Sequence, residues 1–501
     1  MSSDRPLVLV VAGLDSGGGA GGSADCITVY DNGAFALPAI TALTVQSLKE
    51  VAGLENASDK VFRDTLELAV RDWPRISAVK VGLVCAKSHL DILLDFLANR
   101  LKGVPVVWDP VLTATAGRLD SADLKAQLDD ILPLVTVFTP NLPEALELAS
   151  WSEEDLERRG MRELAGFFLG KGAKSVIIKG GHRADAEHAE DRFACDGLFF
   201  TMSYPKKKGD GAHGGGCALS SAIAALLANN YAPFDAAVLA KAYVTQGIYE
   251  PAVNSDDYRP PIGHNGFVQD IKYCPRIIQE GFPGKNYGFG KTVAQMGLYP
   301  VVADNEWLER LLKLGVKTIQ LRIKDKDDPD LYGKIEKGVE LGKKYQARVF
   351  IDDHYDLAIR AKAYGVHLGM EDLMEADLQK IKDAGLALGV STHGPFEMLK
   401  AYQLDPSYIA LGHIFPTQSK QMPSKPQGVG HLAAQVRLLK GRVPMTAIGG
   451  IKYDRLGDVM DTGVGSAAVI TALTDIKDQG ELERAVASWL ARAGSGGAQS
   501  Y

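Results

Sequence analysis

A glycine-rich stretch in the first half of the chain carries the residues best suited to phosphate chemistry. Residues 209–217 read GDGAHGGGC and run into the Ala- and Leu-rich segment 218–228, which predicts a helix. A glycine-rich loop that opens a helix presents unpaired backbone N–H groups and the positive end of the helix dipole to an anion. We expect Cys217, at the start of this helix, to have a lowered pKa. The alternative interpretation is a flexible loop before a core helix, with Cys217 as a small buried side chain.

A second set of candidate residues lies in the latter half, where polar groups follow successive apolar runs. Cations suit a diphosphate, carboxylates suit Mg²⁺, and glycine-rich strand ends suit a phosphate. The cations are Arg322, Lys324 and Lys420, the carboxylates are Asp353 and Asp372, and the cradle comprises 449–450 and 470–471. Each charge could instead be a surface group, and each Asp could cap the following helix.

The first half must position its residues on a largely parallel sheet. Apolar runs at 7–12, 39–44, 78–84, 105–108, 136–138 and 175–178 alternate with helical segments such as 64–71 and 91–101. Ligands of such sheets bind at the carboxyl ends of the strands. Asp109 and Glu144 are therefore candidate Mg²⁺ ligands, although either could be a cap or turn residue. Other polar groups at strand ends are Gln46, Lys80, Asn141 and Lys179.

The first half resembles the hydroxymethylpyrimidine and phosphomethylpyrimidine kinases, which belong to the ribokinase-like family. The matching motifs are AGLDSGGGAGGSAD, ITALTVQS, VKVGLV, DPVLTATAG, TPNLPEA, VIIKGGH and HGGGCALSSAIAALLA. The resemblance implies a ribokinase-like α/β sandwich and an ATP-dependent kinase that uses Mg²⁺. It assigns the pyrimidine to Asp25 and Gln46, the ATP to Asn141 and Lys179, the metal to Asp109 and Glu144, the base to Cys217, and the anion hole to Gly214 and Gly216.

The second half shows about eight strand–helix units, the pattern of a TIM (β/α)8 barrel, with a small doubly wound domain as the alternative. Its candidate strands are 298–302, 318–322, 348–351, 365–368, 386–390, 408–411, 444–448 and 467–470. The strand ends resemble thiamine-phosphate synthases in the motifs QLRIK, DD, GMED, PTQSK, GGI and VITA. The resemblance implies that the Mg²⁺–diphosphate leaves a pyrimidine and that a thiazole phosphate nitrogen attacks. It assigns substrate binding to Gln320, Asp352, Ser391, Thr417, Ser419, Gly450, Ile470 and Thr471.

Both halves depart from their families at positions near the expected chemistry. Gly215 and Ser23 stand where the kinases have Thr and Gln, and the former predicts a weaker kinase. In the synthase half Asp352, His354 and Met370 replace the usual Asn, Arg and Gln. The added charge of Asp352 could weaken diphosphate binding or recruit more metal.

Length and composition limit the class of protein. The chain has 501 residues, 46% hydrophobic content and a net charge of −7, values typical of a multidomain globular protein without a nucleic-acid partner. Its 5 cysteines are scattered, and the short apolar run at 7–12 does not suit a membrane helix. We expect a cytoplasmic protein with domains at 1–264 and 296–494, a turn-rich linker at 265–295, and homo-oligomers formed through the kinase domain.

The two resemblances support each other, because the product of the kinase is the substrate of the synthase. The sequence therefore predicts a bifunctional thiamine-synthesis transferase. It would phosphorylate hydroxymethylpyrimidine and its monophosphate, then couple the pyrimidine diphosphate with thiazole phosphate to give thiamine phosphate. Two alternatives stay open: a kinase of a pyridoxine-type vitamer, or a protein in which one degenerate half senses thiamine compounds.

Overall fold

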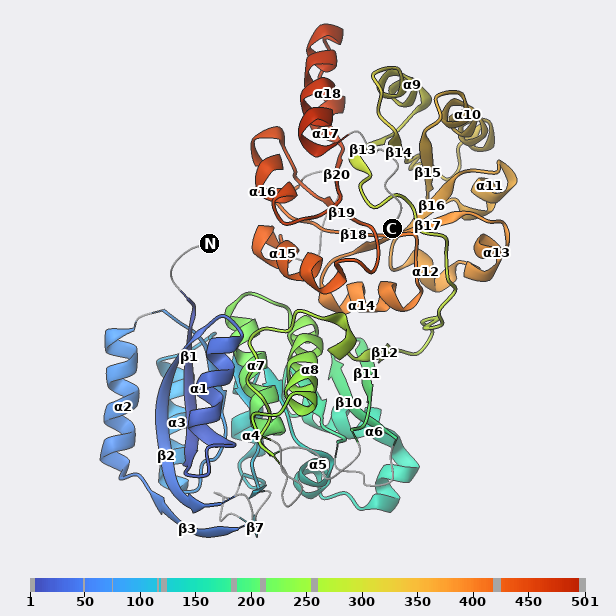
Figure 1. Cartoon of the computed structure of the whole chain (residues 1–501). Helices are drawn as coiled ribbons and strands as arrows, with labels where there is room; N and C mark the ends of the chain where they lie inside the picture. Colours follow the sequence, from blue (N-terminus) through green and yellow to red (C-terminus); the bar gives the residue numbers. More distant parts are fainter. Residues whose placement is uncertain are drawn as a thin grey trace. The chain divides into compact units, whose positions relative to one another are not determined.

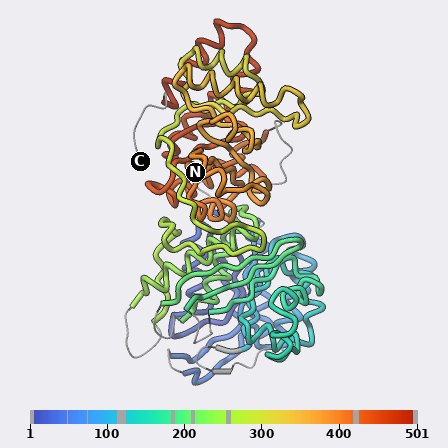
Figure 2. The backbone as a smooth tube through the Cα atoms, turned by 90° about the vertical axis from the view of Figure 1, so that its right-hand side faces the viewer, coloured from blue at the N-terminus to red at the C-terminus, as the bar shows by residue number. Residues whose placement is uncertain are grey.

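The computed structural model describes residues 5–47, 50–73, 75–114, 117–118, 124–181, 187–207, 213–253, 260–417 and 425–494. The chain divides into two compact units, Met1–Glu280 and Gly281–Tyr501. In Figure 2 the first unit takes the colours from blue to green, and the second takes those from yellow to red. Among the described residues no helix is long and apolar enough to cross a membrane.

The first unit is built on a ten-stranded sheet in the order β12-β11-β10-β9-β8-β5-β4-β1-β2-β3 (Figure 1). The six strands from β9 to β2 pair in parallel, and antiparallel strands extend both edges. The largely parallel sheet expected from the sequence is thus confirmed, with four antiparallel edge strands that were not predicted. The strands are β1 (Leu7–Asp15), β2 (Phe35–Gln46), β3 (Val51–Asn56), β4 (Ile76–Val81), β5 (Val106–Trp108), β8 (Val137–Phe138), β9 (Ser175–Ile178), β10 (His188–Cys195), β11 (Leu198–Pro205) and β12 (Arg276–Ile278), beside the small hairpin β6 (Thr113–Ala114) and β7 (Gly117–Arg118).

Helices cover both faces of this sheet (Figure 1). One face carries α1 (Gly21–Asp31), α7 (Gly215–Ala228) and α8 (Pro233–Tyr249), and every residue of α7 from 218 to 228 is buried. The small Ala and Ser side chains of α7 allow this close packing. The other face buries an apolar core beneath α2 (Asp59–Asp72), α3 (Lys87–Asn99), α4 (Leu128–Ile131), α5 (Leu142–Ala149) and α6 (Glu153–Gly170).

The segment that joins the units packs on each of them. Strand β12, inside the expected linker, pairs with β11 and so belongs to the first sheet. Beyond the division at 280, the backbone N–H groups of Tyr287 and Phe289 donate to Leu404 and Asp405 of the second unit at 3.1 and 3.0 Å. Hydrogen bonds therefore tie both parts of this turn-rich segment to a folded unit, while the expected domain limits stay a prediction.

The second unit is a closed eight-stranded parallel barrel, which confirms the TIM-barrel prediction. All eight predicted strands are present, with ends shifted by two residues at most. They are β13 (Gly297–Val302), β14 (Thr318–Leu321), β15 (Arg348–Asp352), β16 (Gly365–Leu368), β17 (Ala387–Thr392), β18 (Tyr408–Leu411), β19 (Met445–Ile448) and β20 (Ser466–Val469).

The barrel strands are surrounded by helices (Figure 1). Aromatic rings fill part of the barrel interior. Tyr299, Phe350 and Tyr408 pack together with ring centroids 5.1 to 6.0 Å apart. The outer helices are α9 (Asn305–Lys313), α10 (Leu331–Lys344), α11 (Tyr355–Arg360), α12 (Asp372–Glu375), α13 (Leu378–Asp383), α14 (Pro395–Gln403), α15 (Gly428–Leu439), α16 (Leu456–Met460), α17 (Thr471–Thr474) and α18 (Gln479–Ala493).

Candidate active sites

Two glycine-rich loops of the first unit interlock at the start of α7. Gly214 has φ +84°, and a Cβ at this position would overlap the carbonyl oxygen of Gly19, so only glycine fits. The His213 ring packs against Gly19, and its Nε2 lies 3.2 Å from Asp15 Oδ2. Asp15 also accepts the N–H groups of Gly17 and Ala20, at 2.7 and 3.0 Å. The loop after β1 and the loop before α7 thereby hold each other in place; residues 209–212, which the sequence included in this stretch, lie outside the described residues.

Cys217 lies in the first turn of α7, as predicted, but its protonation differs from the expectation. Burial raises the pKa of the Cys217 thiol to about 11, against a lowering effect of the Lys80 ammonium. The expectation of a lowered pKa is therefore wrong for the ligand-free protein. The helix dipole and Lys80 favour the thiolate, but desolvation outweighs them, and the carboxylates of Asp25 and Asp109 add repulsion.

A buried ion pair lies under the same helix start. Lys80 Nζ in β4 is 2.5 Å from Asp25 Oδ2 in α1, and both side chains are almost wholly buried. Ser221 of α7 donates to the other Asp25 oxygen at 2.7 Å. Both carboxylate oxygens of Asp25, the predicted pyrimidine ligand, thus have protein partners. Lys80 had no predicted role, although its isolated charge inside an apolar run was a signal that it has a buried partner.

The predicted ATP and metal residues assemble at the carboxyl ends of β5, β8 and β9. Lys179 Nζ lies 2.6 Å from Asp109 Oδ1, and the Asp109 and Glu144 charges raise the pKa of Lys179 against the effect of burial. Burial raises the pKa of Glu144 to about 7, against the Lys179 charge. Asn141 accepts the Glu144 N–H at 2.9 Å while Glu144 accepts the Asn141 N–H at 2.8 Å, a capping box.

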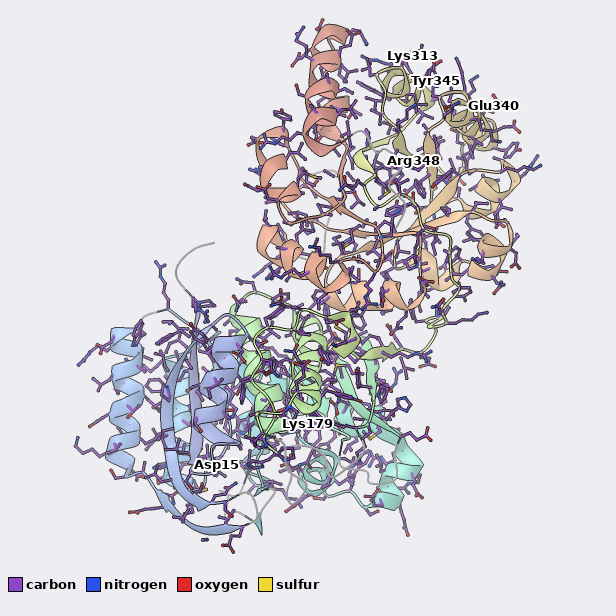
Figure 3. All side chains as sticks on the ribbon, in the orientation of Figure 1. Asp15, Lys179, Lys313, Glu340, Tyr345 and Arg348 are labelled. Atoms are coloured by element: carbon purple, nitrogen blue, oxygen red, sulfur yellow. The ribbon has the colours of Figure 1, made fainter. Side chains whose placement is uncertain are left out.

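The structure brings these groups close to the glycine-rich helix start. A Cβ on Gly216 would lie 3.1 Å from Lys179 Nζ and 3.9 Å from Asp109 Oδ2. In Figure 3 Asp15 and Lys179 lie at the same end of the first sheet, where β1 and β9 end. Gln46 ends β2, where its backbone exchanges hydrogen bonds with Ser16 Oγ at 2.9 and 3.0 Å. This end of the sheet combines cations, carboxylates and backbone N–H groups, as a nucleotide–metal site requires.

At the carboxyl end of the barrel, Asp352 joins two predicted ligands. Its Oδ1 accepts from Gln320 Nε2, and its Oδ2 lies 2.8 Å from Arg322 Nε. Burial raises the pKa of Asp352 to about 7, Asp353 adds to the rise, and Arg322 opposes it. The Asp that replaces the usual Asn is therefore paired with a cation that was expected to bind the diphosphate.

The two predicted metal ligands, Asp353 and Asp372, come together from neighbouring strand ends. Burial, followed by the Asp372 carboxylate, raises the pKa of Asp353. Asp353 has φ +61°, a strained backbone for a non-glycine residue. Asp372 accepts the Gly369 N–H at 3.2 Å, whereas Glu371 occupies the N-cap position of α12. Hence Asp372 does not act as the N-cap that the alternative interpretation requires.

The structure describes most, but not all, of the remaining predicted barrel residues. Lys324 is exposed after β14, and Gly450 follows β19 with a close approach to the loop at 415–416 that precedes Thr417. Ile470 and Thr471 lie at the start of α17, after β20. Lys420 and Ser419 lie outside the described residues.

Sequence reasoning missed a buried polar chain inside the barrel. Ser391 Oγ is 2.7 Å from His367 Nε2, His367 Nδ1 is 2.7 Å from the Tyr408 hydroxyl, and that hydroxyl is 2.7 Å from the hydroxyl of Tyr299. The alternation of inward and outward residues along the predicted strands was the available signal, since it places all four side chains inside the barrel.

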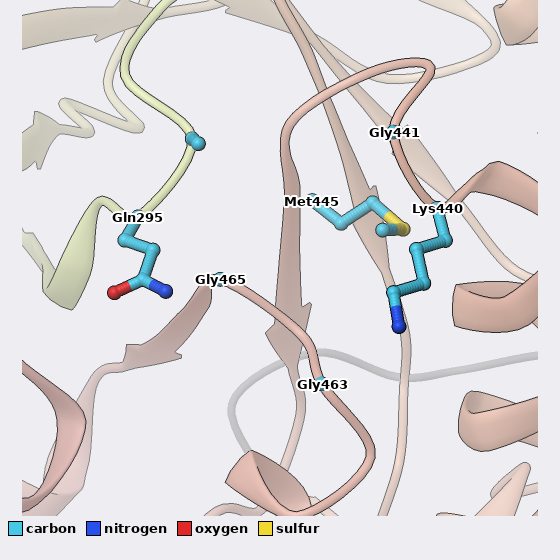
Figure 4. Close-up of a pocket in the computed structure, with 7 residues that line it drawn as sticks. Gln295, Lys440, Gly441, Met445, Gly463 and Gly465 are labelled. Atoms are coloured by element: carbon cyan, nitrogen blue, oxygen red, sulfur yellow. The ribbon is translucent and has the colours of Figure 1, made fainter. Parts of the chain in front are cut away.

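A separate pocket of about 260 Å³ opens at the opposite, amino-terminal end of the barrel (Figure 4). It is lined by Ala294, Gln295, Lys440, Gly441, Met445, Gly463 and Gly465, none of which was predicted to bind a ligand. Active sites of this fold lie at the carboxyl ends of the strands, so we keep the candidate synthase site at that end of the barrel.

Among the described residues, no three His, Cys, Asp or Glu side chains form a preassembled metal site. In proteins Mg²⁺ is commonly bound by one or two carboxylates together with substrate phosphate oxygens and water. Asp353 and Asp372 fit that donor set, because their mutual repulsion is relieved when a cation binds.

Comparisons with known proteins agree with both geometries. Residues 15–261 match the phosphomethylpyrimidine kinase family, and residues 298–473 match the thiamine monophosphate synthase family. A thiamine-phosphate synthase from Pectobacterium atrosepticum is 55% identical over 190 residues, which cover 38% of this chain and 89% of that protein.

Solved structures resemble the first unit as well. A phosphomethylpyrimidine kinase from Clostridium difficile 630 is 30% identical, covering 49% of this chain and 100% of that one, with a TM-score of 0.42. A pyridoxal kinase from Staphylococcus aureus in complex with ADP is 27% identical, covering 53% of this chain and 95% of that one, with a TM-score of 0.47.

Fold and family matches together define a pair of fused transferase domains, a kinase followed by a (β/α)8 synthase. The chain belongs to the phosphomethylpyrimidine kinase family through its first unit and to the thiamine-phosphate synthase family through its second.

Proposed function

We propose that the chain is a bifunctional enzyme of thiamine synthesis. Its kinase unit phosphorylates hydroxymethylpyrimidine and then its monophosphate, with ATP as donor. Its synthase unit couples the resulting diphosphate with thiazole phosphate. The observation that carries the proposal is the fusion of these two families in one chain, since the product of the first is the substrate of the second.

In the kinase unit, phosphoryl transfer rests on positioning and charge neutralisation. Backbone N–H groups at Gly214 and Gly216 are placed to receive the transferred phosphoryl group, because this loop opens α7 and is held against Gly19. Lys179 supplies positive charge for ATP. Cys217 takes the proton of the substrate hydroxyl in the first phosphorylation. In the second phosphorylation the attacking group is an oxygen of the pyrimidine monophosphate, which is already largely ionised at neutral pH.

Mg²⁺ in the kinase unit fits beside Asp109 and Glu144, where two carboxylates share one lysine. When bound, the ion neutralises charge that develops on the phosphates. The capping box keeps Glu144 directed toward this end of the sheet. We assign the pyrimidine ring to Gln46, at the end of β2, and to Asp25, whose Oδ1 accepts a hydrogen bond from Ser221.

In the synthase unit, loss of diphosphate needs cations around the departing group. Arg322 and Lys324 supply them on β14, and the predicted contribution of Lys420 adds to theirs. Asp353 and Asp372 would hold Mg²⁺, which when bound would neutralise charge on the leaving diphosphate. Gln320, Asp352 and Ser391 surround the pyrimidine.

The thiazole phosphate occupies the rim formed after the last strands of the barrel, where phosphate sites of this fold commonly lie. Gly450 and the start of α17 at Ile470 and Thr471 provide its backbone N–H donors. Thr417 and Ser419, from the loop after β18, complete the predicted cradle.

We also propose that copies associate through the kinase unit. Large apolar side chains are exposed on α1 and β2, namely Ile27, Tyr30, Phe35, Leu43 and Val45, which are 44 to 63% exposed. Exposed apolar side chains on these two elements support an interaction surface there. A Leu43→Lys variant should shift the molar mass measured by light scattering to that of one chain; an unchanged mass would contradict this interface. A cytoplasmic location remains our prediction.

Paired single-site variants test the bifunctional assignment. Cys217→Ala should lower phosphorylation of hydroxymethylpyrimidine by about a hundredfold or more, the scale of a lost general base, and leave coupling of supplied pyrimidine diphosphate unchanged. Asp372→Asn should show the opposite pattern. Loss of both activities in either variant, or faster phosphorylation of pyridoxine than of hydroxymethylpyrimidine, would contradict the proposal.

A further inference from the structure

The buried chain Tyr299–Tyr408–His367–Ser391 links the interior of the barrel to its carboxyl end. Tyr299, Tyr408 and His367 are 1%, 0% and 5% exposed, whereas Ser391 is partly exposed one residue before β17 ends. Each step is a 2.7 Å hydrogen bond between side chains of different strands. The chain therefore ends in one hydroxyl that a ligand can reach.

The neighbouring sequence is adapted to this chain. Gly389 of β17 lies opposite Tyr408 in register, and a Cβ at Gly389 would overlap the Tyr408 ring. Phe350 packs edge-on against the same ring, with centroids 5.1 Å apart. The position of the Tyr408 hydroxyl is thus fixed by packing, independently of its hydrogen bonds.

His367 carries a single ring proton. Both ring nitrogens of His367 lie 2.7 Å from a hydroxyl oxygen. If both nitrogens carried hydrogen, the Tyr408 hydroxyl would have to donate to Tyr299, and the buried hydroxyl hydrogen of Tyr299 would then have no acceptor among the described residues. One ring nitrogen then donates and the other accepts. The chain has only two consistent directions of donation, either from Tyr299 toward Ser391 or from Ser391 toward Tyr299.

Burial distinguishes these two directions. If donation runs from Ser391 inward, the hydroxyl hydrogen of Tyr299 needs an acceptor, and no second partner for this hydroxyl exists among the described residues. A buried donor without an acceptor is costly, whereas an oxygen with a free lone pair is tolerated more readily. If donation runs from Tyr299 outward, every hydrogen inside the barrel has an acceptor.

We propose that Tyr299, Tyr408 and His367 are positioning residues for Ser391. Tyr299 and Tyr408 hold His367 as the Nε2–H tautomer, and His367 in turn leaves the hydroxyl hydrogen of Ser391 free for the ligand. Nε2–H donates to Ser391 Oγ, so the Ser391 hydrogen points to the barrel mouth. The site therefore offers a hydrogen-bond donor to an acceptor atom of its substrate at this position. This deepens the proposed synthase function and rests on it for the identity of the ligand.

Nuclear magnetic resonance of the full chain tests the tautomer without any assay of activity. The protein has 10 histidines, and a His367→Gln variant assigns the signals of a ¹⁵N-histidine-labelled sample. We expect a pyrrole-type Nε2 and a pyridine-type Nδ1 for His367, and a changed Nδ1 shift in Tyr408→Phe. The reverse tautomer, an imidazolium or an unchanged Nδ1 shift would overturn the proposal.

Kinetics of the synthase step test the consequence. Ser391→Ala and Tyr408→Phe should each lower kcat/KM for the pyrimidine diphosphate by about three- to tenfold, the effect of one lost hydrogen bond. The double variant should be no slower than Ser391→Ala alone, because both changes remove the same interaction. Multiplying effects would overturn the coupling.

Tyr364→Phe is the matched control. Its ring also packs edge-on against Phe350, with centroids 5.3 Å apart, but its hydroxyl contacts Thr292 instead of the chain. This variant should leave kcat/KM unchanged, and an equal loss in it would overturn the specific role of Tyr408. If the wild-type chain makes no thiamine phosphate, the synthase function fails, while the tautomer measurement still decides the inference.

Discussion

Replacing Asp372 by Asn should make the ligand-free barrel more stable at neutral pH. Asp353 and Asp372 are both partly buried, and the Asp372 charge helps to raise the pKa of Asp353. A carboxyl whose pKa is higher in the folded chain destabilises the fold as the pH rises through its unfolded value of about 4 and onward through its folded value. The variant removes the repelling charge, and the Asn oxygen can still accept the Gly369 N–H.

The size of the effect follows from the electrostatics of a partly exposed pair. Two charges ~4 Å apart interact by about 4 kcal/mol at an effective dielectric constant of about 20. Solvent and salt at the barrel rim reduce this to about 1 kcal/mol. For a unit of this size that corresponds to a rise in Tm of about 2–4 °C at pH 7. At pH 3 the carboxyl groups are largely protonated, and most of the rise should disappear.

Calorimetry of the full chain, with and without Mg²⁺ and diphosphate, measures these terms. At a ligand concentration of about 100 times Kd, the wild-type barrel should gain about 2.7 kcal/mol, and Asp372→Asn should lose most of that gain together with thiamine phosphate synthesis. Asp377→Asn is the matched control, because Asp377 is the N-cap of the next helix, α13, and its Asn variant keeps a capping oxygen. An Asp372→Asn variant that melts lower than wild type and still synthesises thiamine phosphate would refute the reasoning.

Three further predictions follow from the described contacts. Gly215→Thr should keep the fold and raise kinase activity, because a Cβ there meets only Val244 Cγ1 at 3.6 Å. Gly214→Ala should destabilise the first unit, because its Cβ would overlap Gly19; equal melting temperatures of the two variants would contradict this. With the pKa of Cys217 at about 11, kinase kcat/KM should rise about tenfold per pH unit between about pH 7 and 9, and a flat profile would argue against Cys217 as the base. A chain that starts at Gly281 should fold and retain synthase activity. A chain that starts at Lys291 loses the backbone hydrogen bonds to 404–405 and should melt at a lower temperature. Identical melting temperatures of the two chains would show that these hydrogen bonds do not stabilise the barrel.

The sequence predicted the barrel well because its signal is repetitive. Eight short apolar runs, each followed by a helical segment, leave few alternative topologies. In the first unit the edge strands β3, β10, β11 and β12 were missed. Strand β10 mixes charged and apolar residues, and β12 has three residues inside a Pro- and Gly-rich junction. Edge strands depend on their neighbours more than on their own propensity.

The sequence predicted which residues lie at the strand ends, but not the contacts and pKa shifts of their side chains. Strand ends identified Asp109, Lys179, Asp353 and Asp372, because parallel strands bring their carboxyl ends together. The pKa of Cys217 was predicted in the wrong direction, since the argument from a helix start includes the dipole and omits desolvation, which depends on tertiary packing.

Contacts between residues that are distant in sequence could not be predicted either, because they also depend on tertiary packing. The contact between Lys80 and Asp25, 55 positions apart, depends on how α1 packs on the sheet. The chain from Tyr299 to Ser391 depends on which inward side chains meet across the barrel.

The central claim is that one chain performs consecutive steps of thiamine synthesis. The most direct measurement is to incubate the pure protein with hydroxymethylpyrimidine, ATP, Mg²⁺ and thiazole phosphate and to follow the products by mass spectrometry. We predict the pyrimidine monophosphate and diphosphate as intermediates, followed by thiamine phosphate and diphosphate. Thiamine phosphate that forms only when pyrimidine diphosphate is supplied, with hydroxymethylpyrimidine left unphosphorylated, would contradict the claim.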